Sequence, residues 1–288
     1  MLKKTRGIYV AIALLFCVAA KASSPASDSA TSVIDDSATN LFSYAVLSKV
    51  SYLPTNEIND LAKTSESVQS STKPIATKQF SGKHATFVQS VLDNADQTNQ
   101  QILNDRKKLL SLQSEYKRTQ SLSASDSMWI NNLADEYKVA APKLSDSATW
   151  QELDKRVDIV PVSLVLAQAI QESGWGSSPV ARFGHNYFGQ ECFSRGCGIT
   201  GGHHYRGNYY EMAKFTDISE AISTYIHNLN SNKAYRVMRE IRYLERKQNK
   251  SIDSIELVNG LTAYSQLGSH YIAAIKKVVT HLNLQKFD

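Results

Sequence analysis

Apolar side chains recur at helical spacing along most of the chain from His84 onward. Between His84 and Leu110 the apolar pairs repeat with a period near 3.6 residues, which predicts one long amphipathic helix. Ser125 is a start signal for the next helix, and Asp217 and Glu220 have the spacing of a capping box. The same periodicity predicts helices at residues 125–137, 149–157, 215–247, 254–265 and 269–284. We therefore predict a mainly α fold.

One predicted helix, at residues 162–172, has almost no polar face. Pro161 suits the first turn of a helix, and a helix that is apolar all round is a buried, central one. Gly174 and Gly176 follow directly and are predicted to end it. Glu172 is therefore predicted to lie at the C-terminal end of a buried helix.

The remaining segments carry weaker signals. Residues 177–215 are rich in glycine, tyrosine and phenylalanine, and the loose alternation of "HHYRGNYYEMAKF" at 203–215 predicts a small β-hairpin lobe. Residues 23–78 are Ser/Thr-rich with too few apolar positions to build a core, which predicts a linker or disordered segment. The run "MREIRYLERKQNK" at 238–250 is predicted to be a solvated helix face.

The N-terminus has the three parts of a signal peptide. A basic segment is followed by a short apolar run at residues 8–20 and by the small-residue pattern at 20–22. Because the run is too short for a comfortable membrane span, we predict that residues 1–22 are removed on export to the periplasm or the outside of the cell. An uncleaved membrane anchor is the alternative. Residues 79–288 are then the folded catalytic domain.

Export changes the charge balance. The whole chain carries a formal net charge of +5, and residues 1–22 hold four basic residues and no acids, so the balance falls to +1 (5 − 4). The basic character is mostly a targeting signal and gives no support for nucleic-acid binding. We predict no nucleic-acid partner and no stable membrane span after removal of the leader.

Two cysteines remain after removal of the leader. Cys192 and Cys197 form a C-x4-C pair, which in an oxidising compartment predicts a small disulfide-closed loop. The alternative is a zinc site with His203 and His204. Two adjacent histidines do not easily both turn to one metal ion, so the disulfide is favoured.

Glu172 is the candidate catalytic group. Burial and the negative end of the helix dipole both favour the protonated carboxyl. A carboxyl held protonated beside an apolar wall, here Trp175, is what a general acid needs. The alternative is a solvent-facing glutamate in a frayed last turn.

The segment "QAIQESGWGSSPVARFGHNYFGQECFSRGCG" at 168–198 resembles the signature of bacterial Bax-type glucosaminidases, which belong with the flagellar-type and autolysin β-N-acetylglucosaminidases. The resemblance extends over roughly residues 80–288. It implies a lysozyme-like α fold and hydrolysis of the β-1,4 bond after N-acetylglucosamine in peptidoglycan glycan strands. It implies neither a metal nor an organic cofactor.

The resemblance also assigns site residues. It puts the family's catalytic glutamate on Glu172 and the family's C-terminal tyrosines on Tyr264 and Tyr271. Its Asn-x-Phe-Gly segment, which would line the glycan groove, falls on Asn186, Phe188 and Gly189, and we add Tyr187 and Trp175 as aromatic contacts. From the residues alone, Tyr264, Tyr271 and Phe188 are equally consistent with packing, and Trp175 with a wedge at the helix end.

Glycoside hydrolysis commonly uses a second carboxyl. Asp217 and Glu220 are explained by the capping box, and Glu191 is interpreted as exposed loop. Glu211 lies on the predicted hairpin and is our candidate, although the substrate's own N-acetyl group can replace a second carboxyl. Lytic transglycosylase chemistry and a non-catalytic glycan-binding scaffold are the alternative functions.

Overall fold

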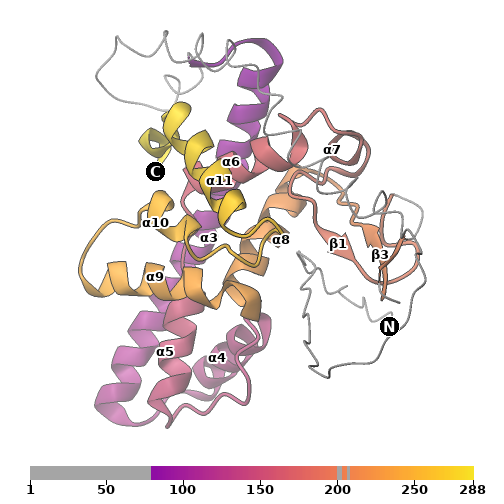
Figure 1. The fold of residues 1–288 in the computed structure, drawn as a ribbon. Coiled ribbons are helices and arrows are strands. Elements are labelled where there is room, and N and C mark those ends of the chain that lie inside the picture. The colour runs from indigo at the N-terminus through magenta and orange to yellow at the C-terminus, as the bar shows by residue number, and fades with distance from the viewer. Residues whose placement is uncertain (1–78, 200–202, 206–207) are drawn as a thin grey trace, which may run out of the picture.

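The computed structural model describes residues 79–288 apart from residues 200–202 and 206–207. Figure 1 shows a helical body with a small β lobe at one side. The prediction of a mainly α fold with a small hairpin lobe is confirmed. The predicted leader peptide and Ser-rich linker lie outside the described residues.

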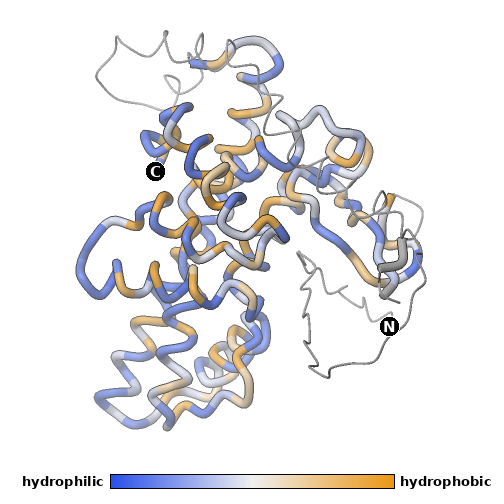
Figure 2. Tube along the Cα trace, viewed as in Figure 1, coloured by the Kyte–Doolittle hydropathy of each residue, from blue (hydrophilic) through white to orange (hydrophobic). Residues whose placement is uncertain are grey.

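Helix α3, Gly82–Thr119, runs along the helical body (Figure 1). Its 38 residues span about 57 Å at 1.5 Å per residue. Figure 2 shows hydrophobic and hydrophilic stretches alternating along it, as expected of an amphipathic helix. Its buried face packs against α6, Val162–Ser173, and α8, Ile218–Ser231, and includes Val88, Val91, Ala95, Ile102 and Leu109.

Short polar side chains start several of the other helices. Ser123, rather than the predicted Ser125, caps α4, because its hydroxyl accepts a hydrogen bond from the Asp126 amide at 3.1 Å. Asp217 accepts from the Glu220 amide at 2.8 Å, so this half of the predicted capping box forms at α8. The remaining helices are α4 Ala124–Glu136, α5 Ser147–Arg156, η2 Lys233–Tyr235, α9 Arg236–Lys247, α10 Ser254–Val258, α11 Ser269–His281 and η3 Leu284–Phe287.

The β lobe follows α6 in the chain. It begins with α7, Pro179–Gly184, which was not predicted because six residues are too few to show a helical period. Three antiparallel strands follow in the order β1-β3-β2, with β1 at Glu191–Cys192, β2 at His203–Tyr205 and β3 at Asn208–Met212. The predicted hairpin is β2–β3, and β1 adds a short third strand beside it.

Asp158, between α5 and α6, is the centre of a buried cluster of charges. Arg246 Nη2 lies 2.9 Å from its Oδ1, and Arg106 Nε lies 3.7 Å from its Oδ2. Burial alone would raise the pKa of Asp158, but the hydrogen bond from Arg246 and the charges of Arg242 and Arg106 outweigh burial and lower that pKa. The cluster ties α3 and α9 to the chain between α5 and α6.

Arg242 of α9 is fully buried and hydrogen-bonds to the protein chain. Its guanidinium donates to three main-chain carbonyls in the segment 155–159 at 2.7–3.1 Å, and to Asn230 Oδ1 at 2.8 Å. Arg239, nearly one turn earlier, is buried as well. The prediction of a solvated face at 238–250 is wrong for these two arginines, because charge in a sequence does not show which residues find buried acceptors.

We predict that Arg242→Ala lowers the free energy of unfolding by about 3–5 kcal/mol, because four buried acceptor oxygens lose their donor and Asp158 loses one of the three charges that lower its pKa. Urea unfolding followed by circular dichroism measures the change. Arg236→Ala, on the exposed side of the same helix, is the matched control and should change stability by less than about 0.5 kcal/mol. Equal stabilities of the two variants would show that the buried cluster does not hold the body together.

Candidate active site

Glu172 is half-buried in the last turn of α6, directly before a tight left-handed turn. Gly174, Trp175 and Gly176 have φ values of +57°, +60° and +72°. The left-handed region suits glycine, so the two glycines flank one residue, Trp175, that carries backbone strain. Ser173 braces the turn, since its hydroxyl accepts from the Gly176 amide at 2.7 Å. The predicted helix end is confirmed, and it places Glu172 where the chain reverses.

Gly189 lies against the carboxyl of Glu172. A Cβ built on Gly189 would be 3.9 Å from Glu172 Oε2, and the φ of +64° favours glycine. The predicted Asn-Tyr-Phe-Gly segment is thus brought to the candidate acid. Its side chain Asn186 is 2 % exposed and donates to the carbonyls of Gln190 and Ala213 at 2.7 and 3.0 Å. Asn186 therefore shapes the loop from within.

Buried aromatic rings hold this loop on α6. Phe188 stacks on Tyr225 with ring centroids 3.9 Å apart, and the Tyr264 hydroxyl donates to the Phe188 carbonyl at 2.9 Å. Tyr264 stacks in turn on Tyr271, whose hydroxyl accepts from Gln168 Nε2 at 2.7 Å. Since these rings are buried, they offer no open face to a sugar. They support the predicted groove by positioning the loop, and direct contact with a glycan stays a prediction.

The pKa values of the tyrosines in this region are all raised. Burial raises the pKa values of Tyr264 and Tyr271 well above the ordinary value, and the negative charge of Glu172 raises both further. That charge also raises the pKa values of Tyr225 and Tyr235. The four hydroxyls therefore keep their protons, mainly because they are buried.

Trp175 packs against the start of α3. Its indole stacks on His84 with centroids 4.5 Å apart and contacts Phe80 and Phe87 at 5.7 and 6.4 Å. Phe87 also lies 5.9 Å from Tyr187, which is half-buried. Trp175 therefore lies as a wedge between the end of α6 and the start of α3, as one of the two sequence interpretations predicted. The aromatic residues of α3 were not predicted as part of this region, although their clustering at the helix start was visible.

Glu211 is held in the disulfide loop. The predicted Cys192–Cys197 bond is present, and the Glu211 carboxylate accepts from the amides of Gly196 and Gly198 at 2.9 and 2.6 Å. It also accepts from the Tyr209 hydroxyl, and these three hydrogen bonds lower the pKa of Glu211, with Tyr209 the largest cause. The catalytic role of Glu211 stays a prediction, but both oxygens of its carboxylate already accept hydrogen bonds from the loop.

Glu191 does not lie in an exposed loop. It is the first residue of β1 and is half-buried, which corrects the sequence interpretation. Burial raises the pKa of Glu191 from 4.5 to about 7. A carboxyl with this environment was indistinguishable from a surface glutamate in the sequence, because β1 has only two residues.

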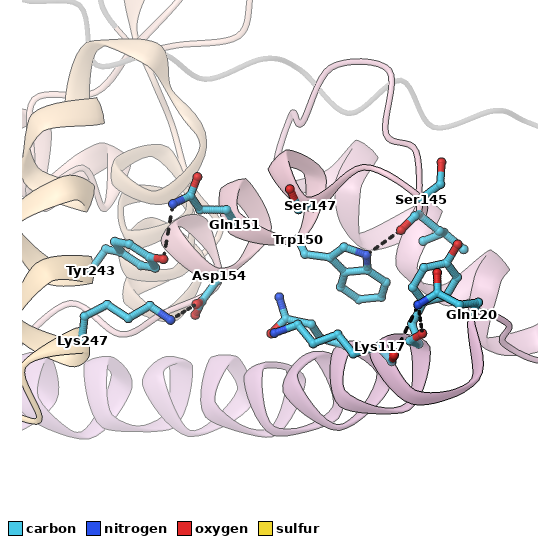
Figure 3. A pocket seen from close by; sticks show the side chains of 12 residues that line it. Lys117, Gln120, Ser145, Ser147, Trp150, Gln151, Asp154, Tyr243 and Lys247 are labelled. Atoms are coloured by element: carbon cyan, nitrogen blue, oxygen red, sulfur yellow. Dashed lines mark hydrogen bonds and ion pairs between the residues drawn. The ribbon is translucent and has the colours of Figure 1, made fainter.

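A hollow of about 400 Å³ lies elsewhere, between α3, α5 and α9. Figure 3 shows Asp154 paired with Lys247 there, at 3.6 Å, and Gln151 bonded to the Tyr243 hydroxyl. No residue that the sequence predicted for the site lines this hollow. The predicted site residues that the structure brings together lie instead around Glu172 and Gly189.

We predict that Cys192 and Cys197 carry no free thiol. The full chain has a third cysteine, Cys17, in the predicted leader, so titration of the unreduced, unfolded protein should find at most one thiol. Reduction should lower the free energy of unfolding by about 2 kcal/mol, the value for opening a loop this short. Cys192→Ser with Cys197→Ser is the control and should show no effect of reductant. A count of two or three free thiols would contradict the prediction.

Comparisons with known proteins agree with this geometry. Residues 147–284 match the family model described as glucosaminidase, mannosyl-glycoprotein endo-beta-N-acetylglucosaminidase. The chain is 30% identical over 207 residues to the protein named "Protein bax" of Escherichia coli (strain K12), and the alignment covers 71% of this chain and 72% of that protein. No solved structure is significantly similar. The matched family region contains Glu172, the loop over it and the whole β lobe, while α3 and α4 precede it. The chain belongs to the Bax-type glucosaminidase family.

Proposed function

We propose that this protein is an exported peptidoglycan hydrolase that cleaves the β-1,4 bond after N-acetylglucosamine. The observation that carries the proposal is the placement of the Glu172 carboxyl at the end of a buried helix and beside Gly189 of the predicted glycan-binding loop. Membership of the glucosaminidase family supports a glycosidase activity. The substrate, the bond and the export are our inference from the sequence.

In this proposal Glu172 is the general acid. It gives its proton to the glycosidic oxygen as the bond to the anomeric carbon breaks. The loop at residues 186–190 holds the sugar against this carboxyl, with half-buried Tyr187 as the aromatic side chain within reach of solvent. No metal or organic cofactor takes part.

The predicted leader and the disulfide support a location outside the cytoplasm. The predicted signal peptide directs the chain out of the cytoplasm, and a closed Cys192–Cys197 bond suits an oxidising compartment. None of the helices in the described part of the chain is long and apolar enough to cross a membrane. We propose that the partner outside the cytoplasm is the glycan strand of the cell wall.

We expect Glu172→Gln to lower the cleavage of purified peptidoglycan by about 10²- to 10⁴-fold, the contribution of a general acid. The amide keeps the shape of the side chain and cannot donate this proton. Glu256→Gln, an exposed glutamate of α10, is the control and should cleave like the wild type. Release of reducing ends is the measurement.

Mass spectrometry of the products separates the alternatives. Reducing N-acetylglucosamine ends support the proposed hydrolase, whereas anhydromuramic ends mean lytic transglycosylase chemistry. Cleavage of mannosyl glycoprotein in preference to peptidoglycan would overturn the substrate. Unchanged cleavage by Glu172→Gln would overturn the acid, and binding without cleavage by the wild type would make the protein a glycan-binding scaffold.

A further inference from the structure

Glu191 lies two residues beyond Gly189, where a Cβ would be 3.9 Å from Glu172 Oε2. Two peptide units span at most about 7 Å, so the Cα atoms of Glu191 and Gly189 lie within that distance. Between them, Gln190 turns inward and donates to the Ala221 carbonyl at 3.1 Å. Glu191 thus enters the sheet at the edge of the region where the sequence and the family place the substrate.

The sheet register sets the direction of the Glu191 side chain. Cys192 lies opposite Glu211, and the two Sγ atoms of the disulfide lie within 4.8 Å of the Glu211 carboxylate, so these groups share one face. Side chains alternate along a strand, which puts Glu191 on the other face, with its register partner Met212 and with Tyr210. Burial raises the pKa of Tyr210, and the negative charge of Glu191 raises it further, as expected of two side chains on one face.

The two glutamates of this strand pair have opposite environments. Glu211 accepts three hydrogen bonds. Glu191 is half-buried, and its carboxyl forms neither a hydrogen bond nor an ion pair with the described residues. A buried, uncompensated carboxylate lowers stability, and groups of this kind gather at functional sites.

The titratable neighbours of Glu191 are few among the described side chains. Tyr210 of β3 faces it, and Met212 beside it is neutral. Arg195 acts on Tyr209 and Glu211, which belong to the opposite face. Burial is therefore the cause that raises the pKa of Glu191 to about 7, and a base with this pKa is well matched to neutral pH.

We propose that Glu191, and not Glu211, is the second carboxyl of the reaction and accepts a proton from the attacking water. This inference rests on the proposed glycosidase function of Glu172. The carboxylate of Glu191 removes one proton from water as the water oxygen bonds to the anomeric carbon. In the same step the bond to the departing oxygen breaks, and that oxygen takes the proton of Glu172. Both carboxyls then return to their starting states by exchanging one proton with solvent.

The kinetic test uses soluble glycan strands prepared from peptidoglycan. Glu191→Gln should lower kcat/KM by about 10²- to 10⁴-fold. The base must be ionised, so wild-type kcat/KM should fall as pH drops through about 7. This fall of kcat/KM at low pH, the acid limb of the profile, should persist when nearby histidines are replaced. The two control variants are His185→Gln, next to the loop, and His203→Gln, whose residue lies opposite Tyr210 in the sheet register. Loss of the limb in either histidine variant would overturn the assignment.

Azide rescue and the stereochemistry of the product test for a catalytic base, because a purely structural role of Glu191 would affect neither. Azide needs no base, so it should restore turnover of Glu191→Ala and yield a glycosyl azide. The reaction is a single displacement, so nuclear magnetic resonance of the first product should show the inverted anomer. No azide rescue, or a product that keeps the β configuration, would overturn the role of Glu191.

Thermal stability is an independent test, because replacing the two glutamates by glutamine should change the melting temperature at pH 8 differently. The folded pKa of Glu191 is raised from 4.5, so ionisation lowers stability as pH rises between 4.5 and about 7. Glu191→Gln should therefore melt no lower than the wild type at pH 8. Glu211→Gln should melt lower at pH 8, because its carboxylate loses charge-assisted hydrogen bonds. The reverse order would overturn the proposal.

Failure of this proposal can be told apart from failure of the proposed function. If the wild type does not cleave glycan, the proposed function is wrong, and Glu191 has no reaction to serve. If the wild type cleaves, Glu172→Gln is inactive and Glu191→Gln retains full activity with the acid limb, only the role of Glu191 is wrong.

Discussion

The packing of the loop at residues 186–190 against the C-terminal end of α6 is the interaction on which the candidate site depends. Gly189 lies beside the Glu172 carboxyl, since a Cβ at that position would be 3.9 Å from Glu172 Oε2. Tyr264 holds the loop by its hydrogen bond to the Phe188 carbonyl. Without this contact Glu172 would be an ordinary acid at a helix end. With it, the end of α6 and the loop that Tyr264 holds lie side by side at the Glu172 carboxyl.

The β lobe uses two glutamates for two purposes. Glu211 accepts three hydrogen bonds, and two of them come from the main chain of the loop that contains the Cys192–Cys197 bond. Glu191, on the other face of the same strand pair, is half-buried and has no hydrogen-bond donor among the described residues. The number of donors around a carboxyl, rather than its distance in sequence from Glu172, separates a group that stabilises the fold from one poised to exchange a proton.

The sequence predicted the features that depend on local patterns. The periodicity of α3, the apolar run of α6, the glycines that end α6 and the cysteine pair each required only neighbouring residues. Glu172 could be singled out because a helix end, a dipole and an aromatic neighbour are all local. The hairpin was predicted for the same reason, from alternation within 203–215.

The features that the sequence did not predict depend on long-range contacts. Arg242 is buried because segment 155–159 supplies its acceptors, which no charge pattern reveals. Glu191 was taken for exposed loop because a two-residue strand has no period. Phe188, Tyr264 and Tyr271 were assigned to the groove by family resemblance, but their burial makes them supports of the loop. Family motifs identify which residues belong to a site, and only packing shows how each contributes.

The most direct test of the central claim is a crystal structure of Glu172→Gln with a glycan strand bound. We predict that a glycosidic oxygen lies within about 3.2 Å of the side-chain amide at position 172, the distance over which an acid can pass its proton. The sugar should lie against the loop that contains Gly189. A glycan bound instead in the hollow between α3, α5 and α9, with no sugar near position 172, would contradict the account.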